Sequence, residues 1–337
     1  MGIRMSRSHF PSCVATLLGI ALSLLPAACS QHQPPLSSDQ QALALQQQGI
    51  DRIKAASDHF RKTGNLSSTP ADMDVAEKLL LDSYQAFDRQ GDFAAAGKSL
   101  VWLGKTQDAR VAAAQAKSYG WSGKKNPTEQ DKQGIAEEHS RFASIVQNNK
   151  SAIEYYLQAE QKAIQAGDKT LQVQALTGLA NMQRGLPDLG AAKKNIEQAV
   201  QLGAELADKT VQFDALQTAA NIQIELGNFD AALELSNRAL IAADAAADEK
   251  SLFYGYLKRA DVYHGLAARL ADQHKFDLSL QNCEYERKDN QEALKLAKNL
   301  GFTFFYDWLI PSNFLDLDIL EELLRSKKKS ESTQKTQ

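Results

Sequence analysis

The residues that could bind a metal gather in one stretch of the chain. His264 and His274 lie near Asp272, Asp277 and Cys283. Ten residues separate the two histidines, a spacing that does not place two ligands on one helix face as structural metal sites require. We therefore interpret this stretch as a solvated loop, and we predict no bound metal.

Acid–base chemistry has equally little support. Glu137 with Glu138, or Glu284 with Glu286, could form a carboxylate pair, but charges on helix surfaces are usually only solvated. The sequence contains no phosphate-binding glycine loop, no Gly-x-Ser-x-Gly, no Cys-x-x-Cys and no His-Glu-x-x-His. We predict a protein that is not an enzyme, with no catalytic residues and no cofactor.

Composition indicates helix and argues against a nucleic-acid partner. The apolar share is 43%, while aromatic residues make up only 7%, so alanine and leucine dominate the apolar content and favour helix over sheet. The formal net charge is −3, which implies no strongly basic face.

An internal repeat of 40 residues organises the chain. The segment that begins DKTLQVQALTGLAN at Asp168 aligns without gaps with DKTVQFDALQTAAN at Asp208. Equivalent positions carry the same residues in Leu176 and Leu216, Ala180 and Ala220, Asn181 and Asn221, Ala192 and Ala232, and Ala199 and Ala239. The register extends back to Ala152 and Ala159 and forward through Asp248, Ala260 and Asp261.

Each unit consists of two helical stripes joined by a short breaker, LGNFD at 226–230 in the clearest copy. Gly227 suits a left-handed residue at a helix end, and Asn228 or Asp230 can begin the next helix. Ala220, Ala232 and Ala239 would allow close helix contact, with Phe229 and Leu235 filling the remaining space. One hairpin cannot bury its own apolar face, so we predict an all-α array of stacked hairpins.

The run LGNFDAALELSNRAL resembles the signature of the tetratricopeptide repeat family, and Leu216 to Ala220 fits the first helix of that repeat. The family unit has about 34 residues, so longer helices or connections are expected here. The resemblance implies a TPR-like α-solenoid that binds a protein or an extended peptide. A generic array of helical hairpins is the alternative.

The remaining segments fit around the repeats. Residues 41–120 should form N-terminal helices, with one helix over 39–62 and a divergent TPR-like unit over 84–104, and residues 119–131 should form a loop. Repeats cover 133–301, with the clear copies in 133–252 and an insertion, or an extension of the hairpin, over 265–288 before a helix at 289–301. Residues 302–310 are β-like, and this run ends at Pro311. Ser312 or Asn313 would then cap a last helix. Residues 302–326 would cover the open end of the array, and residues 327–337 would be disordered.

Asn181, Asn221 and Asp261 recur every 40 residues, each directly after a packing alanine. In the family, this position faces the concave groove, where an amide can both donate to and accept from a peptide backbone. The resemblance therefore implies a peptide-binding ladder. The alternatives are that duplication alone preserved these residues, or that they pair between repeats.

The N-terminus is typical of an export signal. Arg4 and Arg7 precede the uncharged run VATLLGIALSLL at 14–25, which is too short to span a bilayer comfortably. The following LPAAC resembles a bacterial lipobox, with Pro26 where that signal usually has leucine. The resemblance implies a signal peptide over 1–28 and lipidation of Cys29, and the following Ser30 suggests the outer membrane. An ordinary cleaved signal and an uncleaved anchor are the alternatives.

Residues 29–40 then form a polar tether. Together these features predict a non-enzymatic scaffold anchored in the bacterial envelope by lipid and facing the periplasm, with a protein or peptide partner there and no nucleic acid. A structural or assembly subunit of an outer-membrane complex, without a peptide groove, is the alternative, and a sensor of soluble ligands is a third.

Overall fold

The computed structural model describes residues 36–63, 69–116, 129–186 and 189–334. The expected signal peptide, Cys29 and most of the tether lie outside these residues, while Ser38–Gln40, which were assigned to the tether, already belong to the first helix. The described residues contain no strand; their helices are α1 (Ser38–Thr63), α2 (Thr69–Gln90), α3 (Phe93–Ala116), α4 (Glu129–Ala166), α5 (Lys169–Arg184), α6 (Leu189–Gly203), α7 (Lys209–Glu225), α8 (Phe229–Ala245), α9 (Glu249–Asp272), α10 (Phe276–Leu300), the π-helical segment η2 (Phe305–Leu309) and α11 (Ile310–Gln334).

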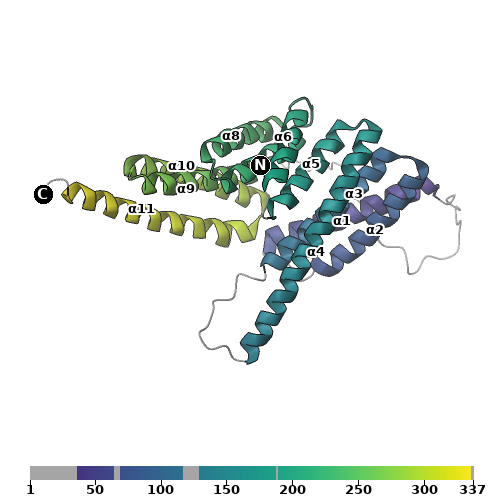
Figure 1. Cartoon of the computed structure of the whole chain (residues 1–337), viewed down its shortest axis with the longest axis horizontal. Helices are drawn as coiled ribbons and strands as arrows, with labels where there is room; N and C mark the ends of the chain where they lie inside the picture. The colour runs from purple at the N-terminus through teal and green to yellow at the C-terminus, as the bar shows by residue number, and fades with distance from the viewer. Residues whose placement is uncertain (1–35, 64–68, 117–128, 187–188, 335–337) are drawn as a thin grey trace, which may run out of the picture. The chain divides into compact units, whose positions relative to one another are not determined.

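Consecutive helices pack against each other along the array, as Figure 1 shows for α9, α10 and α11. The alternate helices α3, α5, α7 and α9 also contact one another in that order. These two sets of contacts are those of stacked helical hairpins, because each hairpin covers the apolar face of its neighbour. The predicted all-α repeat array is confirmed.

The 40-residue repeat sets where the helices begin. Asp168, Asp208 and Asp248 are the N-cap residues of α5, α7 and α9, and each side chain accepts a hydrogen bond from a backbone N–H in the first turn. Such a cap satisfies donors that have no partner within the helix and is worth about 1 kcal/mol. The recurrence of aspartate at this spacing therefore has a local structural cause.

The alanines of the repeat lie at the helix contacts, as predicted. Ala220, Ala232 and Ala239 are fully buried, and Gly227 adopts the left-handed conformation with φ of 73°. Phe229 reaches the following unit, where its ring lies against Gly265. A Cβ atom on Gly265 would stand 2.1 Å from a Phe229 ring carbon, so the backbone of α9 can approach only because glycine occupies this position.

The first predicted unit is not a hairpin. Residues 129–166 form the single 38-residue helix α4, which begins within the segment expected to be a loop over 119–131 and packs against α3. The rest of that predicted loop lies outside the described residues. Ala152 and Ala159 are fully buried, like their counterparts Ala192 and Ala199. The register therefore identified α4 as the second helix of a pair. Its first helix, α3, lies outside the 40-residue register, and the divergent unit predicted over 84–104 spans the end of α2, the turn at Gly91 and the start of α3.

Residues 265–288 extend the hairpin and contain no loop insertion. Helix α9 has 24 residues against 17 in α7, and α10 begins at Phe276 instead of the predicted Asp289. The turn between them places His274 in the left-handed conformation, with φ of 58°. His274 thus occupies the position that Gly227 holds in the clear copy. The missing glycine is the reason why sequence alone placed the turn too late.

The β-like run 302–310 is also helical. Phe302 and Phe305 pack edge-on against the buried Phe253 of α9, at ring-centroid distances of 5.4 and 5.1 Å. This aromatic contact outweighs the intrinsic strand preference of the run. The π-helical segment leads directly into α11, so the last helix begins at Ile310 and neither Ser312 nor Asn313 caps it. Pro311 directly follows the π-helical segment and has no N–H to donate to the preceding turn.

Helix α11 covers α10, as expected of a capping segment. Leu317 and Leu324 are buried against Ala267, Phe276 and Cys283. The helix continues to Gln334, so residues 327–334 are not disordered. Lys328 pairs with Asp277, and His274 pairs with Glu331, at the start of α10.

Helix α1 reaches the far end of the array. The Arg61 guanidinium Nε donates a 2.9 Å hydrogen bond to the Tyr254 hydroxyl of α9. The Phe60 ring lies 5.6 Å from the ring of Phe304. Among the helices that the structure describes, none has the length and apolar character needed to cross a membrane.

Candidate ligand-binding face

Polar side chains form matched columns on α5 and α7. Gln174, Thr177 and Asn181 follow one face of α5, and Asp214, Gln217 and Asn221 occupy the positions 40 residues later on α7. Spacings of three and four residues keep each set on one side of its helix. We call these six side chains the ladder face.

Several polar atoms of the ladder face have no partner. The Thr177 Oγ1, Gln217 Oε1 and Asn221 Oδ1 atoms are buried and make no hydrogen bond within the described part of the chain. Thr177 and Gln217 are equivalent positions of two repeats. A buried acceptor without a donor costs about 1–3 kcal/mol. The repeat therefore places an unmatched polar group at the same point of two neighbouring helices.

Three hollows meet at Lys105 on α3. Hollow A lies between α1, α3 and α5, hollow B between α1, α3 and α9, and hollow C between α3, α4, α5 and α7. Their volumes are about 520, 520 and 130 Å³. Hollow C contains Gln174, Thr177, Asn181 and Asp214 of the ladder face, and it shares Lys105 and Asp108 with hollow B.

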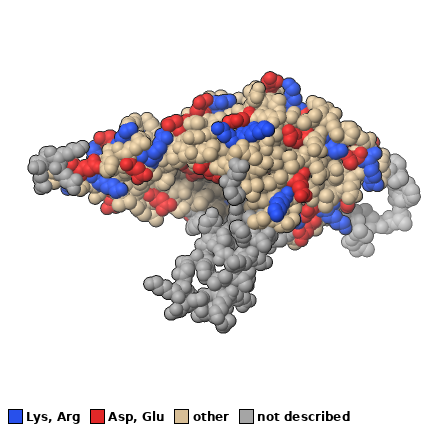
Figure 2. All heavy atoms as spheres, in the orientation of Figure 1, with Lys and Arg blue, Asp and Glu red and all other residues tan. Residues whose placement is uncertain are grey.

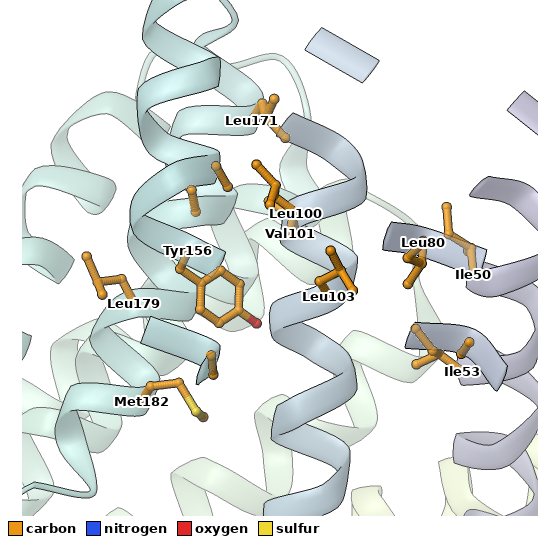
Figure 3. Packing of buried hydrophobic residues seen from close by; sticks show 14 of the residues in the cluster. Ile50, Ile53, Leu80, Leu100, Val101, Leu103, Tyr156, Leu171, Leu179 and Met182 are labelled. Carbon is orange, nitrogen blue, oxygen red and sulfur yellow. The ribbon is translucent and has the colours of Figure 1, made fainter. Parts of the chain in front are cut away.

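Tyr156 holds one wall of hollow C in place. Figure 3 shows its ring between α3 and α5, with the hydroxyl directed toward α3. Gly104 and Gly178 border the ring, and a Cβ atom on either would lie 2.4 or 2.3 Å from a ring atom. The hydroxyl donates a 2.9 Å hydrogen bond to Asp108 Oδ2. The repeat pattern did not indicate this contact, because Gly104 lies outside the clear repeats and Tyr156 stands where the next copies carry Ile196 and Ser236.

Asp108 is electrostatically unusual. Its Oδ1 atom is buried without a hydrogen-bond partner in the described structure. Burial raises the pKa of Asp108 to about 7, against the opposing effects of the Tyr156 hydrogen bond and the Lys105 charge. Desolvation by the surrounding helices also raises the pKa of Asp214, an exposed residue that lines hollow C. Both carboxylates are thus easier to protonate than ordinary surface acids.

Positive side chains line hollow B on the other side of Asp108. Lys54, Arg61, Lys105 and Lys250 come from three helices, and among the described residues only Arg61 has an acidic ion-pair partner, Asp58. The Lys105 ammonium lies 4.7 Å from the centre of the Trp102 ring, and that of Lys54 lies 5.7 Å away. Burial and the nearby Arg61 charge lower the pKa of Lys250. Elsewhere, the face visible in Figure 2 mixes both signs of charge.

The three predicted peptide-binding residues have different surroundings. Asn181 lines hollow C, and Asn221 is half-buried with its unpartnered Oδ1. Asp261 is exposed and accepts a 2.6 Å hydrogen bond from Lys258 on its own helix. The structure therefore places Asn181 and Asn221 on the ladder face, but Asp261 already has a basic partner. The other polar positions of the ladder face were not predicted from the sequence, because their residues differ between copies: Gln174 corresponds to Asp214, and Thr177 corresponds to Gln217.

The metal-ligating residue types near the end of the chain pair with other side chains. His264 contacts Glu286 at 3.3 Å, and Cys283 is buried, which raises the pKa of its thiol to about 12. No group of three such residues able to hold a metal occurs in the part of the chain that the structure describes. Glu286 is buried against His264, while Glu284 is exposed, so the two do not form a carboxylate pair.

Comparison with known proteins identifies no family for this chain. No family model matches the chain, and no curated protein matches it. Among solved structures, one similar chain comes from work described as "Computational Design of Self-Assembling Cyclic Protein Homooligomers". It is 14% identical, the match covers 87% of this chain and 96% of that chain, and the TM-score is 0.23. At this TM-score the similarity supports no inference about function.

Proposed function

We propose that this protein is a non-enzymatic, TPR-like scaffold that binds an extended segment of a partner protein across the ladder face. The observation that carries the proposal is the pair of buried oxygen atoms without a hydrogen-bond partner, Thr177 Oγ1 and Gln217 Oε1, one repeat apart. The Gln217 amide nitrogen is already bound, since it donates to the Tyr254 carbonyl at 3.2 Å. Asn181 and Asn221 add amides one turn further along each helix. A peptide backbone offers donors and acceptors at regular intervals whatever its sequence, so it can satisfy such a column.

We expect the double change Asn181→Ala with Asn221→Ala to weaken peptide binding about tenfold. Each lost neutral hydrogen bond should cost about 0.5–1.5 kcal/mol, and the partly exposed side chains contribute little to helix packing. Peptides selected from a displayed library against the purified protein would serve as probes, with affinities measured by fluorescence anisotropy.

Asn299→Ala is the matched control, because Asn299 is exposed near the end of α10. The control should bind like the unchanged protein. Equal affinities for the double variant and the control, with intact helicity, would show that the two asparagines do not contact the peptide.

The N-terminal sequence supports an envelope location for this scaffold. In our proposal the chain is processed at Cys29, acylated there and anchored in the outer membrane facing the periplasm, with residues 30–37 as a short link to α1. This arrangement would hold the ladder face close to the membrane, where the partner is also expected.

We expect the mature protein to begin at Cys29 and to carry acyl chains. Intact-mass spectrometry of protein purified from membranes should give a mass above that of the bare 29–337 chain. Cys29→Ala should remove the excess and release the protein from the membrane fraction. An unmodified N-terminus at another residue would contradict lipidation while leaving the peptide-binding proposal untouched.

One observation favours the alternative, a structural or assembly subunit. Leu315, Ile319 and Leu323 are exposed on α11 at a spacing of four residues, with exposed fractions of 61, 51 and 55%. Such a stripe on a terminal helix is unusual, because terminal repeats commonly present a polar outer face. An assembly role would use this stripe, so a partner that loses affinity on Ile319→Lys, but not on the double asparagine change, would favour this alternative.

A further inference from the structure

Lys105 and Asp108 carry opposite charges one turn apart on α3, yet they form no ion pair. Within the described residues, neither has an ion-pair partner within 4.0 Å, and Asp108 keeps a buried oxygen with no hydrogen bond. Both side chains line hollows B and C. Both charged side chains therefore line the junction of these hollows without an ion-pair partner.

The two hollows differ in their balance of charge. Beside the shared Lys105 and Asp108, hollow C holds Asp214 and the unpartnered hydroxyl of Thr177. Hollow B holds Lys54, Arg61 and Lys250 against one further acid, Asp58. Opposite charges a few ångströms apart attract strongly where protein excludes water. A simple cation would suit hollow C better than hollow B, and a simple anion would suit hollow B better than hollow C.

A molecule that carries both charges close together suits the whole junction. We propose that the junction of hollows B and C binds a free α-amino acid, with its ammonium directed to Asp108 and its carboxylate to Lys105. Hollow B, at about 520 Å³, leaves room for the amino-acid side chain against the apolar surfaces of Trp102 and Ile53. A residue inside a peptide chain has neither charge, so this ligand differs in chemistry from the peptide backbone, although hollow C shares four residues with the ladder face.

The protonation state of Asp108 links binding to pH. The charged and titratable groups that face it are Tyr156 of α4, Lys105 of its own helix and Asp214 of α7, while Lys250 of α9 and Asp58 and Arg61 of α1 lie across hollow B. An ammonium beside Asp108 lowers its pKa from about 7, because it favours the ionised form. Amino-acid binding should therefore release protons near neutral pH and weaken as the pH falls below about 7.

Calorimetric titration of the purified full chain with leucine and tryptophan tests the proposal. N-acetyl-leucine, which lacks the ammonium, and leucinamide, which lacks the carboxylate, are the matched probes. We expect each blocked compound to bind at least about tenfold more weakly than leucine, because each loses a charge-assisted contact. Asp108→Asn and Lys105→Gln should each produce a similar loss for leucine itself.

Lys78→Gln and Asp82→Asn are the control variants, since these exposed residues also carry opposite charges one turn apart, on α2. Both should bind leucine normally. Leucinamide binding as tightly as leucine would reduce the site to a cation site, and N-acetyl-leucine binding as tightly would reduce it to an anion site. No binding by any of the common amino acids at millimolar concentration would overturn the proposal.

Circular dichroism of each variant separates lost binding from lost folding. Asparagine keeps the shape of Asp108 and can still accept the Tyr156 hydrogen bond, and Lys105→Gln provides an independent variant if Asp108→Asn unfolds. Peptide binding by the ladder face is measured separately with the library-selected peptides. Failure of the amino-acid titration therefore leaves the peptide result unchanged, and the reverse also holds.

Discussion

Replacing Tyr156 with alanine is expected to lower the free energy of unfolding by about 3–5 kcal/mol, as for other buried aromatic residues. The Tyr156 side chain is 1% exposed and fills the space between Gly104 and Gly178. Neither glycine has a side chain that could move into the vacated volume. Loss of the hydroxyl also leaves Asp108 with no hydrogen bond from Tyr156 to its buried carboxylate. Denaturant unfolding followed by circular dichroism would measure the change.

Tyr156→Phe separates the ring from the hydroxyl. This variant keeps the contact with both glycines and should lose only about 1–3 kcal/mol, the cost of leaving the Asp108 carboxylate unsatisfied. If the alanine and phenylalanine variants unfold at the same denaturant concentration, the ring does not contribute through the glycine contacts, and the packing described for α3, α4 and α5 is wrong.

The second large effect is expected for Arg259→Met. The guanidinium donates two 2.7 Å hydrogen bonds to Asp289 and one of 2.8 Å to Asn237. Asp289 is only 4% exposed, so removal of Arg259 leaves a buried carboxylate without a counter-ion. Breaking a buried pair in this way costs about 3–5 kcal/mol. Arg259 itself is partly exposed, so we expect a value near the lower limit, measured by denaturant unfolding at pH 8.

The pH dependence gives this prediction a specific sign. Burial already raises the pKa of Asp289 in the folded protein, and Arg259 opposes that rise. Without Arg259 the folded pKa rises further above its unfolded value. A raised folded pKa favours the folded state at low pH, and this contribution is lost as the pH rises through the folded pKa. The variant should therefore lose less stability at pH 5 than at pH 8.

The double change Arg259→Met with Asp289→Asn is the control. It removes the buried charge together with its partner, and should recover part of the lost stability at pH 8. A deficit for Arg259→Met that is the same at both pH values, or no recovery in the double variant, would show that the buried charge is not the cause.

The fold was predictable from the sequence wherever each repeat uses the same residue for the same structural role. Aspartate at each N-cap and alanine at each close contact recur every 40 residues, so the register identified α5 to α8 and the second helix α4. The turn after α9 was not predicted, because His274 stands where the clear copy has a glycine. Residues 302–310 were misassigned because their helical form depends on contact with Phe253, which lies far away in the sequence.

The candidate site was predictable only in part, for the same reason. Asn181 and Asn221 recur in the sequence and lie on the ladder face. Lys105, Asp108 and Lys250 come from helices that are distant in the chain, and no period connects them. Their proximity follows from how α3, α7 and α9 stack, which periodicity does not specify. Asp261 shows that recurrence alone does not define a site. It occupies the same position of the repeat as Asn181 and Asn221, but of the three only Asp261 pairs with a lysine on its own helix, Lys258.

The contact between α1 and α9 has a consequence for how the array unfolds. In a simple repeat protein each unit touches only its neighbours, so the ends can fray while the middle stays folded. Here a hydrogen bond joins Arg61 to Tyr254, residues that are 193 positions apart in the chain. Opening the first helix therefore also removes contacts from the hairpin of α9 and α10. The array should melt as one cooperative unit, and its folding should be slowed by the entropy of closing so long a loop.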